Sequence, residues 1–318
     1  MKQRSSNIGG QAVMEGIMMR HKDRYAIAVR KPDKEIEIKI EDYKNVIPLE
    51  KLGKLPIFRG VFSFIDSLVV GTKCLMYSAS FFEEEEEEVK AKEQMTEEER
   101  AKQEKKEEKA YNIMMTVTLC ISVLLSIGLF ILLPFFVASF LRKVTDSNLI
   151  VTIAESVLRI AIFLIYMLLI SRMEDIQRVF MYHGAEHKCI NCIEHGMDLN
   201  VENVLKSSRL HKRCGTSFLL IVMVVSIIFF FFIHVESSVW RVVIRLLLMP
   251  VVAGVSYEFI RLAGRSDNKC VALLSKPGMA LQKLTTKEPT ADMVEVAIAA
   301  VEAVFDWKEY VKELREDE

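Results

Sequence analysis

Net charge is almost absent from this sequence. Its 42 Lys and Arg residues balance 43 Asp and Glu residues, so the formal charge is −1 at pH 7. Because no basic excess remains, we expect no nucleic-acid partner. The six cysteines are scattered and do not form the framework of a disulfide-rich secreted domain. The first 20 residues also lack an apolar core and a small-residue cleavage site, so we expect no removable signal peptide.

Apolar residues, in contrast, make up 51% of the sequence and gather into long uncharged runs. Four runs are close to about 20 residues long, the length that a helix needs to cross a bilayer core. Very short links join the first run to the second and the third to the fourth, which indicates two hairpins. The expected fold is therefore a mainly α membrane protein with four transmembrane helices, at residues 113–141, 149–171, 216–235 and 239–260.

The basic residues predict the orientation of these helices. The loop at 172–215, between the hairpins, must share a side with both ends of the chain. Basic residues crowd this loop, while the opposite side offers mainly Arg142 and Lys143. By the positive-inside rule, the N- and C-termini lie in the cytoplasm and the chain crosses the plasma membrane several times, with the lipid bilayer as its partner.

Residues 1–55 are expected to form a small cytoplasmic β unit. The stretches 25–30 and 35–40 alternate between apolar and polar residues, which predicts a hairpin with one buried face. Before them, the apolar and glycine-punctuated stretch 8–20 favours a buried strand and turn. The alternative is a loop that brings Glu15 to a functional site.

Three other segments complete the domain organisation around the transmembrane hairpins at 113–171 and 216–260. Residues 56–82 are apolar but interrupted by charges, and we expect an interfacial or re-entrant helix more than a spanning one. Residues 83–112 form an acidic linker, either a solvated helix or a disordered segment. The cytoplasmic C-terminal region, 261–318, contains an amphipathic helix that starts after Pro289 and should pack on the β unit or on the 172–215 loop.

A His-x-x-Glu-His motif lies just beyond the second apolar run. In a helix, His183, Glu186 and His187 share one face because residues three and four apart are neighbours. Two imidazoles can hold a divalent metal, for which zinc is our expectation, while Glu186 acts as general base on metal-bound water. This is the inverted zincin order. The competing interpretation is two histidines that only hydrogen-bond to loop carbonyls.

Two cysteines near this motif have a spacing that suits zinc or a redox pair. Cys189 and Cys192 form a Cys-x-x-Cys pair, but on a continuous helix Cys192 points almost opposite the imidazoles. Glu194 lies on the correct face, yet about 10 Å along the helix axis from His187. None of the three is therefore expected as a ligand of the same ion.

The third ligand is expected from residues that the topology brings to the same membrane surface. The candidates are Glu258 at the end of the fourth run, or one of His211 and Cys214 just before the third. Glu258 is preferred, because an oxygen ligand with an open position suits catalysis, whereas adding a thiolate would suit a closed structural site. Arg213 would hold a substrate anion or an oxyanion, unless it serves only as an anchor among the head groups. Further side chains expected to contact the substrate or to support the ligands are Glu15, Glu194, Asn191 and Cys214.

Ionisable residues also occur inside the apolar runs. Glu155 and Arg245 lie at similar predicted depths, and Arg159 follows Glu155 by one helical turn. We interpret Glu155 and Arg245 as an intramembrane ion pair that holds the helices together. The alternative is a transport pathway.

Several separated motifs occur in order over nearly the whole chain: Gly9–Gly16 (GGQAVMEG), Arg59-Gly60, Tyr182–Lys188 (YHGAEHK) with Asn191 and Glu194, His211–Gly215 (HKRCG), Thr285–Pro289 (TTKEP) and Glu295–Ile298 (EVAI). Together they resemble a known family, the bacterial YqhQ-like membrane proteins of unknown function. The resemblance implies a metal-dependent enzyme of the bacterial inner membrane. Cys189 and Cys192 are not part of that pattern.

Together these features favour a membrane-bound, metal-dependent hydrolase that acts on a membrane-associated substrate. A non-catalytic scaffold or assembly factor, with a structural metal or a hydrogen-bonded polar cluster, is the first alternative. A transporter that uses Glu155 and Arg245 is the second.

Overall fold

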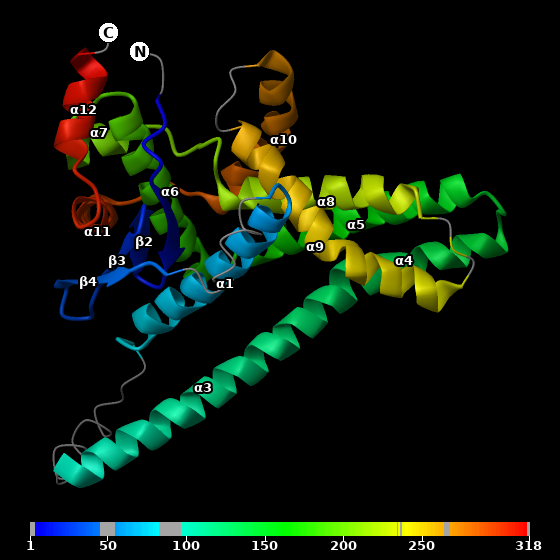
Figure 1. Ribbon diagram of the computed structural model, residues 1–318, viewed down its shortest axis with the longest axis horizontal. Coiled ribbons are helices and arrows are strands. Elements are labelled where there is room, and N and C mark those ends of the chain that lie inside the picture. Colours follow the sequence, from blue (N-terminus) through cyan, green and yellow to red (C-terminus); the bar gives the residue numbers. More distant parts are fainter. Residues whose placement is uncertain are drawn as a thin grey trace. The chain divides into compact units, whose positions relative to one another are not determined.

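The computed structural model describes residues 4–44, 55–82, 97–233, 235, 237–263 and 268–316 (Figure 1). The chain divides into two compact units. The first combines Met1–Phe82 with Met167–Glu318, and the second is Glu83–Tyr166.

An antiparallel four-stranded sheet forms the N-terminal part of the first unit. The strands follow one another in chain order and are joined by tight turns, in which Glu15, Lys22 and Lys34 adopt positive φ angles of 48°, 51° and 73°. The hairpin expected at 25–40 is confirmed, and the apolar stretch before it supplies two more strands. The strands are β1 (Gly9–Val13), β2 (Gly16–His21), β3 (Arg24–Arg30) and β4 (Ile36–Asp42).

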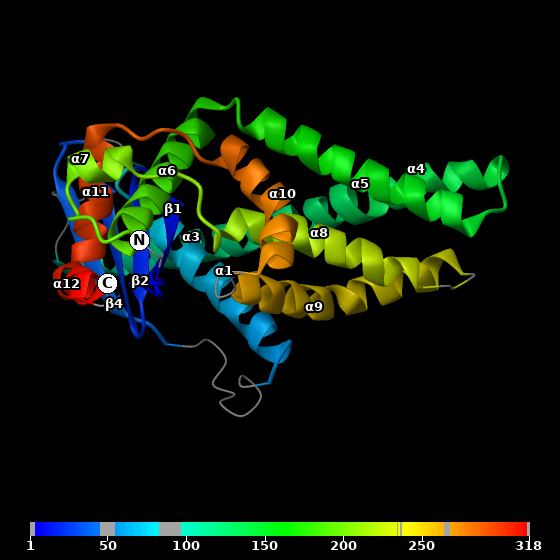
Figure 2. The same cartoon turned by 90° about the horizontal axis from the view of Figure 1, so that it is seen from above.

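Both faces of the inner strands are buried, whereas one buried face was expected. Ile17 and Met19 of β2 belong to a core with helices α6 (Glu174–Glu194) and α11 (Ala291–Glu302), which lie beside the strands in Figure 2. The alternate residues pack with Cys74 and Val70 of helix α1 (Phe58–Ala79). The sheet is therefore enclosed between α1 and the α6–α11 pair. The expected packing of the C-terminal amphipathic helix on the β unit and on the motif segment is confirmed.

Apolar helices make up the rest of the first unit. α1 packs closely on α9 because Gly60 and Gly254 carry no side chains: a Cβ at Gly60 would lie 2.9 Å from the Gly254 Cα. α9 also packs on α8, which packs on α10. The remaining bounds are α7 (Val201–Lys206), α8 (Gly215–Phe231), α9 (Ser238–Ala263), α10 (Lys269–Thr285) and α12 (Trp307–Glu316).

The second unit is a helical hairpin. Helix α3 already begins within the segment expected to be an acidic linker, and residues 83–96 of that linker lie outside the described residues. A short π-helical stretch, η2, connects α3 to α4 without ending the helix. The elements are α3 (Glu97–Ile127), η2 (Gly128–Leu132), α4 (Leu133–Ser139), η3 (Phe140–Lys143) and α5 (Asn148–Ile170), which extends into the first unit.

Within the described ranges, four helices are long and apolar enough to cross a membrane by length and composition: Phe58–Ala79, Ile113–Lys143, Asn148–Ile170 and Val239–Ala263. Three of them coincide with predicted spans. The predicted span at 216–235 corresponds to α8, whose 17 residues extend about 25 Å and fall short of the usual length. The segment at 56–82 instead meets the criterion as α1. The predicted membrane topology stays a prediction.

Candidate functional site

Helix α6 carries the His-x-x-Glu-His motif, and the expected helical conformation is confirmed. Glu174 and Asp175 occupy its first turn, where negative charge stabilises the positive end of the helix dipole. The helix ends at Glu194, and Gly196 follows with φ of 69°, a conformation that favours glycine. From Tyr182 to Glu194 every residue except His183 is buried. The polar groups on this half of α6 must therefore find partners within the protein.

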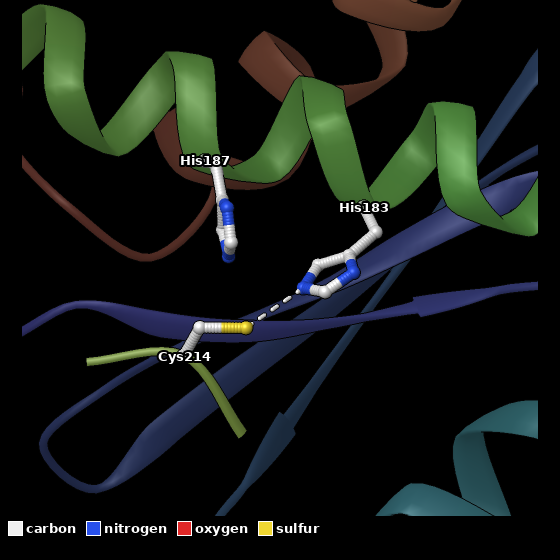
Figure 3. Close-up of side chains that lie close together, drawn as sticks. All are labelled: His183, His187 and Cys214. Atoms are coloured by element: carbon white, nitrogen blue, oxygen red, sulfur yellow. Dashed lines mark hydrogen bonds between the residues drawn. The ribbon is translucent and has the colours of Figure 1, made fainter. Parts of the chain in front are cut away.

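Two imidazoles of α6 meet a thiol at the start of α8. The ligand atoms of His183, His187 and Cys214 all lie within 4.8 Å of one another (Figure 3). Cys214 Sγ lies 3.2 Å from His183 Nε2. Among the described residues this is the one group of at least three His, Cys, Asp or Glu side chains that could hold a metal ion.

Backbone carbonyls fix the orientation of both rings. His183 Nδ1 lies 2.8 Å from the Thr285 carbonyl oxygen, and His187 Nδ1 lies 2.6 Å from that of Arg209. A carbonyl oxygen can only accept a hydrogen bond, so each Nδ1 carries the proton and donates it. In the neutral form of each ring, the lone pair is thus on Nε2. This use of the second ring nitrogen is the usual arrangement of metal-binding histidines.

The distances suit a small tetrahedral ion. Donor atoms around zinc at about 2.0–2.3 Å are separated from one another by about 3.3–3.6 Å. The Cys214–His183 separation of 3.2 Å is close to this range. The upper limit of 4.8 Å within the group requires a contraction of about 1.5 Å at most. Two imidazoles and one thiolate are also ligand types that zinc prefers, so the residues fit the metal.

Cys214 occupies the N-cap of α8. Its sulfur accepts a hydrogen bond from the Thr216 backbone N–H at 3.4 Å and lies 2.8 Å from the Thr216 hydroxyl. The positive end of the helix dipole favours negative charge at this position. The Cys214 sulfur therefore lies at the positively polarised start of α8.

Glu186 lies between the two histidines in sequence and is 6% exposed. Burial raises the pKa of Glu186, although the charge of His183 and a hydrogen bond from the Gly10 backbone oppose the shift. Strand β1 passes close to this carboxyl group, since a Cβ at Gly10 would lie 3.1 Å from the Glu186 Cδ. A side chain at position 10 would therefore crowd the carboxyl group.

A cavity of about 830 Å³ adjoins Glu186 and His183. Residues of β1, β2, α1, α6 and the start of α8 line it. A volume of this size accommodates a small-molecule ligand. The motif therefore faces a space that a substrate can enter.

A buried charge cluster supports the cysteine segment. The Glu194 carboxylate forms an ion pair with Arg213, accepts hydrogen bonds from the Ser6 backbone and hydroxyl at 2.8 Å, and lies 3.5 Å from His211 Nε2. Burial alone would raise the pKa of Glu194, but the hydrogen bond from His211 and the charge of Arg213 outweigh burial and hold the pKa at about 2. The cluster anchors the residues directly before Cys214.

Comparison with known proteins identifies the family. The family described as "Protein of unknown function (DUF1385)" matches residues 55–307. The chain belongs to this family. It is also 36% identical over 295 residues to "Uncharacterized protein YqhQ" of Bacillus subtilis (strain 168), a match that covers 91% of this chain and 89% of that protein. No solved structure matches it. The resemblance to the YqhQ-like family is thus confirmed.

In this DUF1385 protein, several predicted site residues lie away from the cluster. Glu258, the preferred third ligand, forms a bidentate ion pair with Arg59 of α1, at 2.7 Å. Cys214 takes the position beside the imidazoles instead. Glu15, in the β1–β2 turn, pairs with Arg178 near the start of α6. That contact attaches the hairpin to the helix.

Other predicted residues contact the segments that carry or orient the cluster. His211 faces Glu194, so its ring is directed to the charge cluster. Asn191 donates hydrogen bonds to the carbonyl groups of Ser208 and Leu210, and so holds the loop that contributes the Arg209 carbonyl. Cys189 and Cys192 are buried in the core with α11, away from the cluster, as expected.

The predicted Glu155–Arg245 pair joins residues of the two separate units and stays a prediction. Within the second unit, Glu155 forms a buried ion pair with Arg159 at 2.9 Å. Within the first, the Arg245 guanidinium lies 5.0 Å from the centre of the Phe230 ring.

Sequence reasoning missed the groups that orient the imidazoles. Thr285 and Arg209 contribute through their backbone carbonyls, which leave no signal in side-chain chemistry. It also missed Arg20 and Lys22, which line the cavity from β2 and the turn after it. Arg20 and Lys22 are far from the motif in the sequence, so no sequence pattern indicated that they line the same cavity.

Proposed function

We propose that this chain is a membrane-associated, zinc-dependent hydrolase. The observation that carries the proposal is the meeting of His183, His187 and Cys214, with both imidazole lone pairs on Nε2, beside a cavity that Glu186 also lines. Three protein donors leave a tetrahedral ion one position for water or substrate, as in catalytic zinc sites. A structural site uses four.

The residues of the proposed site have different roles. His183, His187 and the Cys214 thiolate would hold zinc, which when bound supplies Lewis acidity and activates water. Glu186 accepts the proton from the attacking water and returns it to the leaving group, as a general base and then a general acid. The Thr285 and Arg209 carbonyls keep the two rings aligned through both steps.

Arg213 lines the cavity and can bind negative charge that develops on the substrate. Its ion pair with Glu194 positions the guanidinium. We further propose that the site lies at the cytoplasmic face of the plasma membrane and acts on a membrane-associated substrate. Apolar helices α1 and α8 contribute to the cavity wall and support this assignment.

A cysteine hydrolase is the second candidate. The 3.2 Å distance between Cys214 Sγ and His183 Nε2, at a helix N-terminus, is also that of an activated thiol nucleophile. This candidate gives no role to His187, whose Nε2 lone pair belongs to the same group. The zinc hydrolase accounts for all three side chains.

Metal analysis of the purified full chain tests the proposal. We expect about one zinc ion per chain, and its loss in H183A, H187A and C214A. The matched control is H195A, because His195 follows α6 but lies outside the group. A cobalt-loaded protein should show thiolate-to-metal charge-transfer absorption that C214S removes. Metal-free wild-type protein would contradict the zinc site and favour the cysteine hydrolase.

Glu186→Gln separates catalysis from structure. With p-nitrophenyl acetate and p-nitrophenyl phosphate as probes, we expect the variant to keep its zinc and lose about 10²–10⁴-fold in turnover, the range for removal of a general base. Glu202→Gln is the control, since Glu202 is exposed on α7. Wild-type turnover in Glu186→Gln would leave a structural metal as the better explanation.

A further inference from the structure

The cavity beside the candidate metal site has a strongly cationic lining. Arg20, Lys22 and Arg213 line it, and Glu186 is the one carboxyl group among the lining residues. Arg213 is ion-paired with Glu194, whereas Arg20 and Lys22 form no ion pair among the described residues, so the net excess at the cavity comes from Arg20 and Lys22. Such an excess attracts an anion and is unfavourable for a cationic or neutral polar ligand.

Each cation is held at the cavity wall differently. The Arg20 guanidinium stacks at 3.1 Å from the centre of the Tyr43 ring, a contact that fixes its plane. Within the part of the chain that the structure describes, Arg20 forms no ion pair with a carboxylate. Lys22 is exposed in the turn after β2. Arg213 is positioned by Glu194 and Ser5 through two of its three nitrogen atoms. Two separate parts of the chain thus bring donors to one space.

The kind of anion follows from the donors. Two guanidinium groups and an ammonium group together offer many N–H donors, which suits a phosphate group with its several acceptor oxygens better than a single carboxylate. The cavity is also far larger than one phosphate ion. Its apolar lining includes Ile8, Met18, Val70, Val179 and Phe180.

We propose that Arg20, Lys22 and Arg213 bind a phosphate group of the substrate in the cavity beside the metal site. This inference rests on the proposed hydrolase and names its substrate class, a phosphorylated compound with an apolar part. The phosphate is held by the cations, and the apolar lining covers the rest of the molecule.

Binding of radiolabelled inorganic phosphate to the full chain in detergent tests the inference. Equilibrium dialysis is performed with added zinc and with a chelator. R20Q and K22Q should each raise the Kd for phosphate roughly tenfold, the loss expected for one charge-assisted contact. Arg213 is left unchanged because its substitution would leave Glu194 buried without its main partner.

Lys34→Gln is the matched control. Lys34 also occupies a strand turn with positive φ and loses the same charge, but it lies at the β3–β4 turn outside the cavity. The Lys34→Gln protein should bind phosphate with the same Kd as the wild type. All variants should retain the wild-type circular dichroism spectrum and zinc content.

A competition experiment distinguishes a lipid from a free phosphate. Dihexanoyl phosphatidic acid should displace the labelled phosphate, while dihexanoyl phosphatidylcholine, whose phosphate is blocked by choline, should displace it poorly. Displacement by phosphatidic acid at a concentration well below that of unlabelled phosphate supports a lipid-borne group. If phosphatidic acid and unlabelled phosphate displace the label at equal concentrations, the result supports a soluble phosphate compound. In both cases phosphate binding in the cavity stands.

Two results would overturn the inference. They are the absence of saturable phosphate binding and an equal loss of binding in K34Q and K22Q. If zinc is present without phosphate binding, this inference fails and the hydrolase stands. If phosphate binds to a chain that holds no zinc, the anion site stands and the hydrolase fails.

Discussion

The C-terminal half of α6 and the hairpin of the second unit differ in what surrounds their side chains. Ile193 in α6 is 0% exposed, whereas Leu125 in α3 is 68% exposed although both are large and apolar. In this half of α6 the protein itself buries every residue except His183 and supplies partners for polar side chains such as Lys188, Asn191 and Glu194. In the hairpin many large apolar residues are exposed within their unit, including Leu119, Leu124 and Val157, which is typical of helices that lipid surrounds. The candidate site therefore lies in the region where the protein itself surrounds the side chains.

Gly184→Ala should have the largest effect. A Cβ at position 184 would lie 2.0 Å from the Lys287 carbonyl oxygen, so α6 and the segment that orients His183 would have to separate. We expect a loss of about 4 kcal/mol in the free energy of unfolding, which exceeds the gain of about 1 kcal/mol in helix propensity. Thermal unfolding in detergent, followed by circular dichroism, measures the change.

Gly128→Ala is the matched control in the other region. A Cβ there meets nothing within 4 Å. It should leave the melting temperature unchanged or raise it slightly. Equal destabilisation by the two substitutions would remove the contrast between the regions.

Glu194→Gln should cause the second-largest loss of stability. The carboxylate has a pKa of about 2 in the folded protein against 4.5 as the reference. A shift of this size corresponds to about 3 kcal/mol. Because the folded pKa is the lower one, this stabilisation is complete above pH 4.5 and disappears as the pH falls from 4.5 through 2. The difference in melting temperature between wild type and variant should therefore be largest at pH 7 and less than half as large at pH 3.

The control for this substitution is Glu202→Gln, whose carboxylate is exposed on α7 beside Lys206. No resolvable change is expected. A Glu194→Gln protein whose melting temperature equals that of the wild type at pH 7 would exclude a stabilising role for the charge cluster.

Leu125→Lys tests the interpretation of the exposed apolar surface. If lipid surrounds this part of α3, a lysine near the middle of the span costs about 2.5–3.5 kcal/mol in membrane insertion. The fraction of chains that resists carbonate extraction from membranes should fall. Leu125→Ala should insert almost as well as the wild type. Full insertion of the lysine variant would mean that water or protein covers this face.

The smallest expected effect comes from shortening an isoleucine in the core, compared with shortening one at an exposed site. Ile193→Val removes one methylene from a filled core and should cost about 1 kcal/mol. Ile153→Val, at a site that is 53% exposed in α5, should change stability by much less. The melting temperatures of the two variants in detergent measure the contrast, and equal shifts would contradict it.

Much of the candidate site could be predicted from the sequence because its central part is local. His183, Glu186 and His187 share one face of α6 through helical geometry alone. The third position could not be predicted in the same way, because Glu258 and Cys214 both adjoin the ends of apolar runs. Arg59 takes the carboxylate of Glu258, and no spacing rule reveals such a pair between α1 and α9.

The fold shows the same division. Alternation and turn residues predicted the β3–β4 hairpin, and the apolar period of residues 293–305 predicted α11. The sheet's second buried face was missed, because it depends on the packing of α1 through Cys74 and Val70. Burial on that face depends on a distant helix.

The sequence by itself determined the apolar runs, the amphipathic helix after Pro289 and the pair of imidazoles on one side of α6. Those features follow from repeat distances within a single element. Only the tertiary structure decided that Cys214 joins them, that the Thr285 and Arg209 carbonyls set their lone pairs, and that Arg20 and Lys22 face the same cavity. The physical reason is that these contacts join residues far apart in the chain, and their partners are chosen by packing and charge in three dimensions.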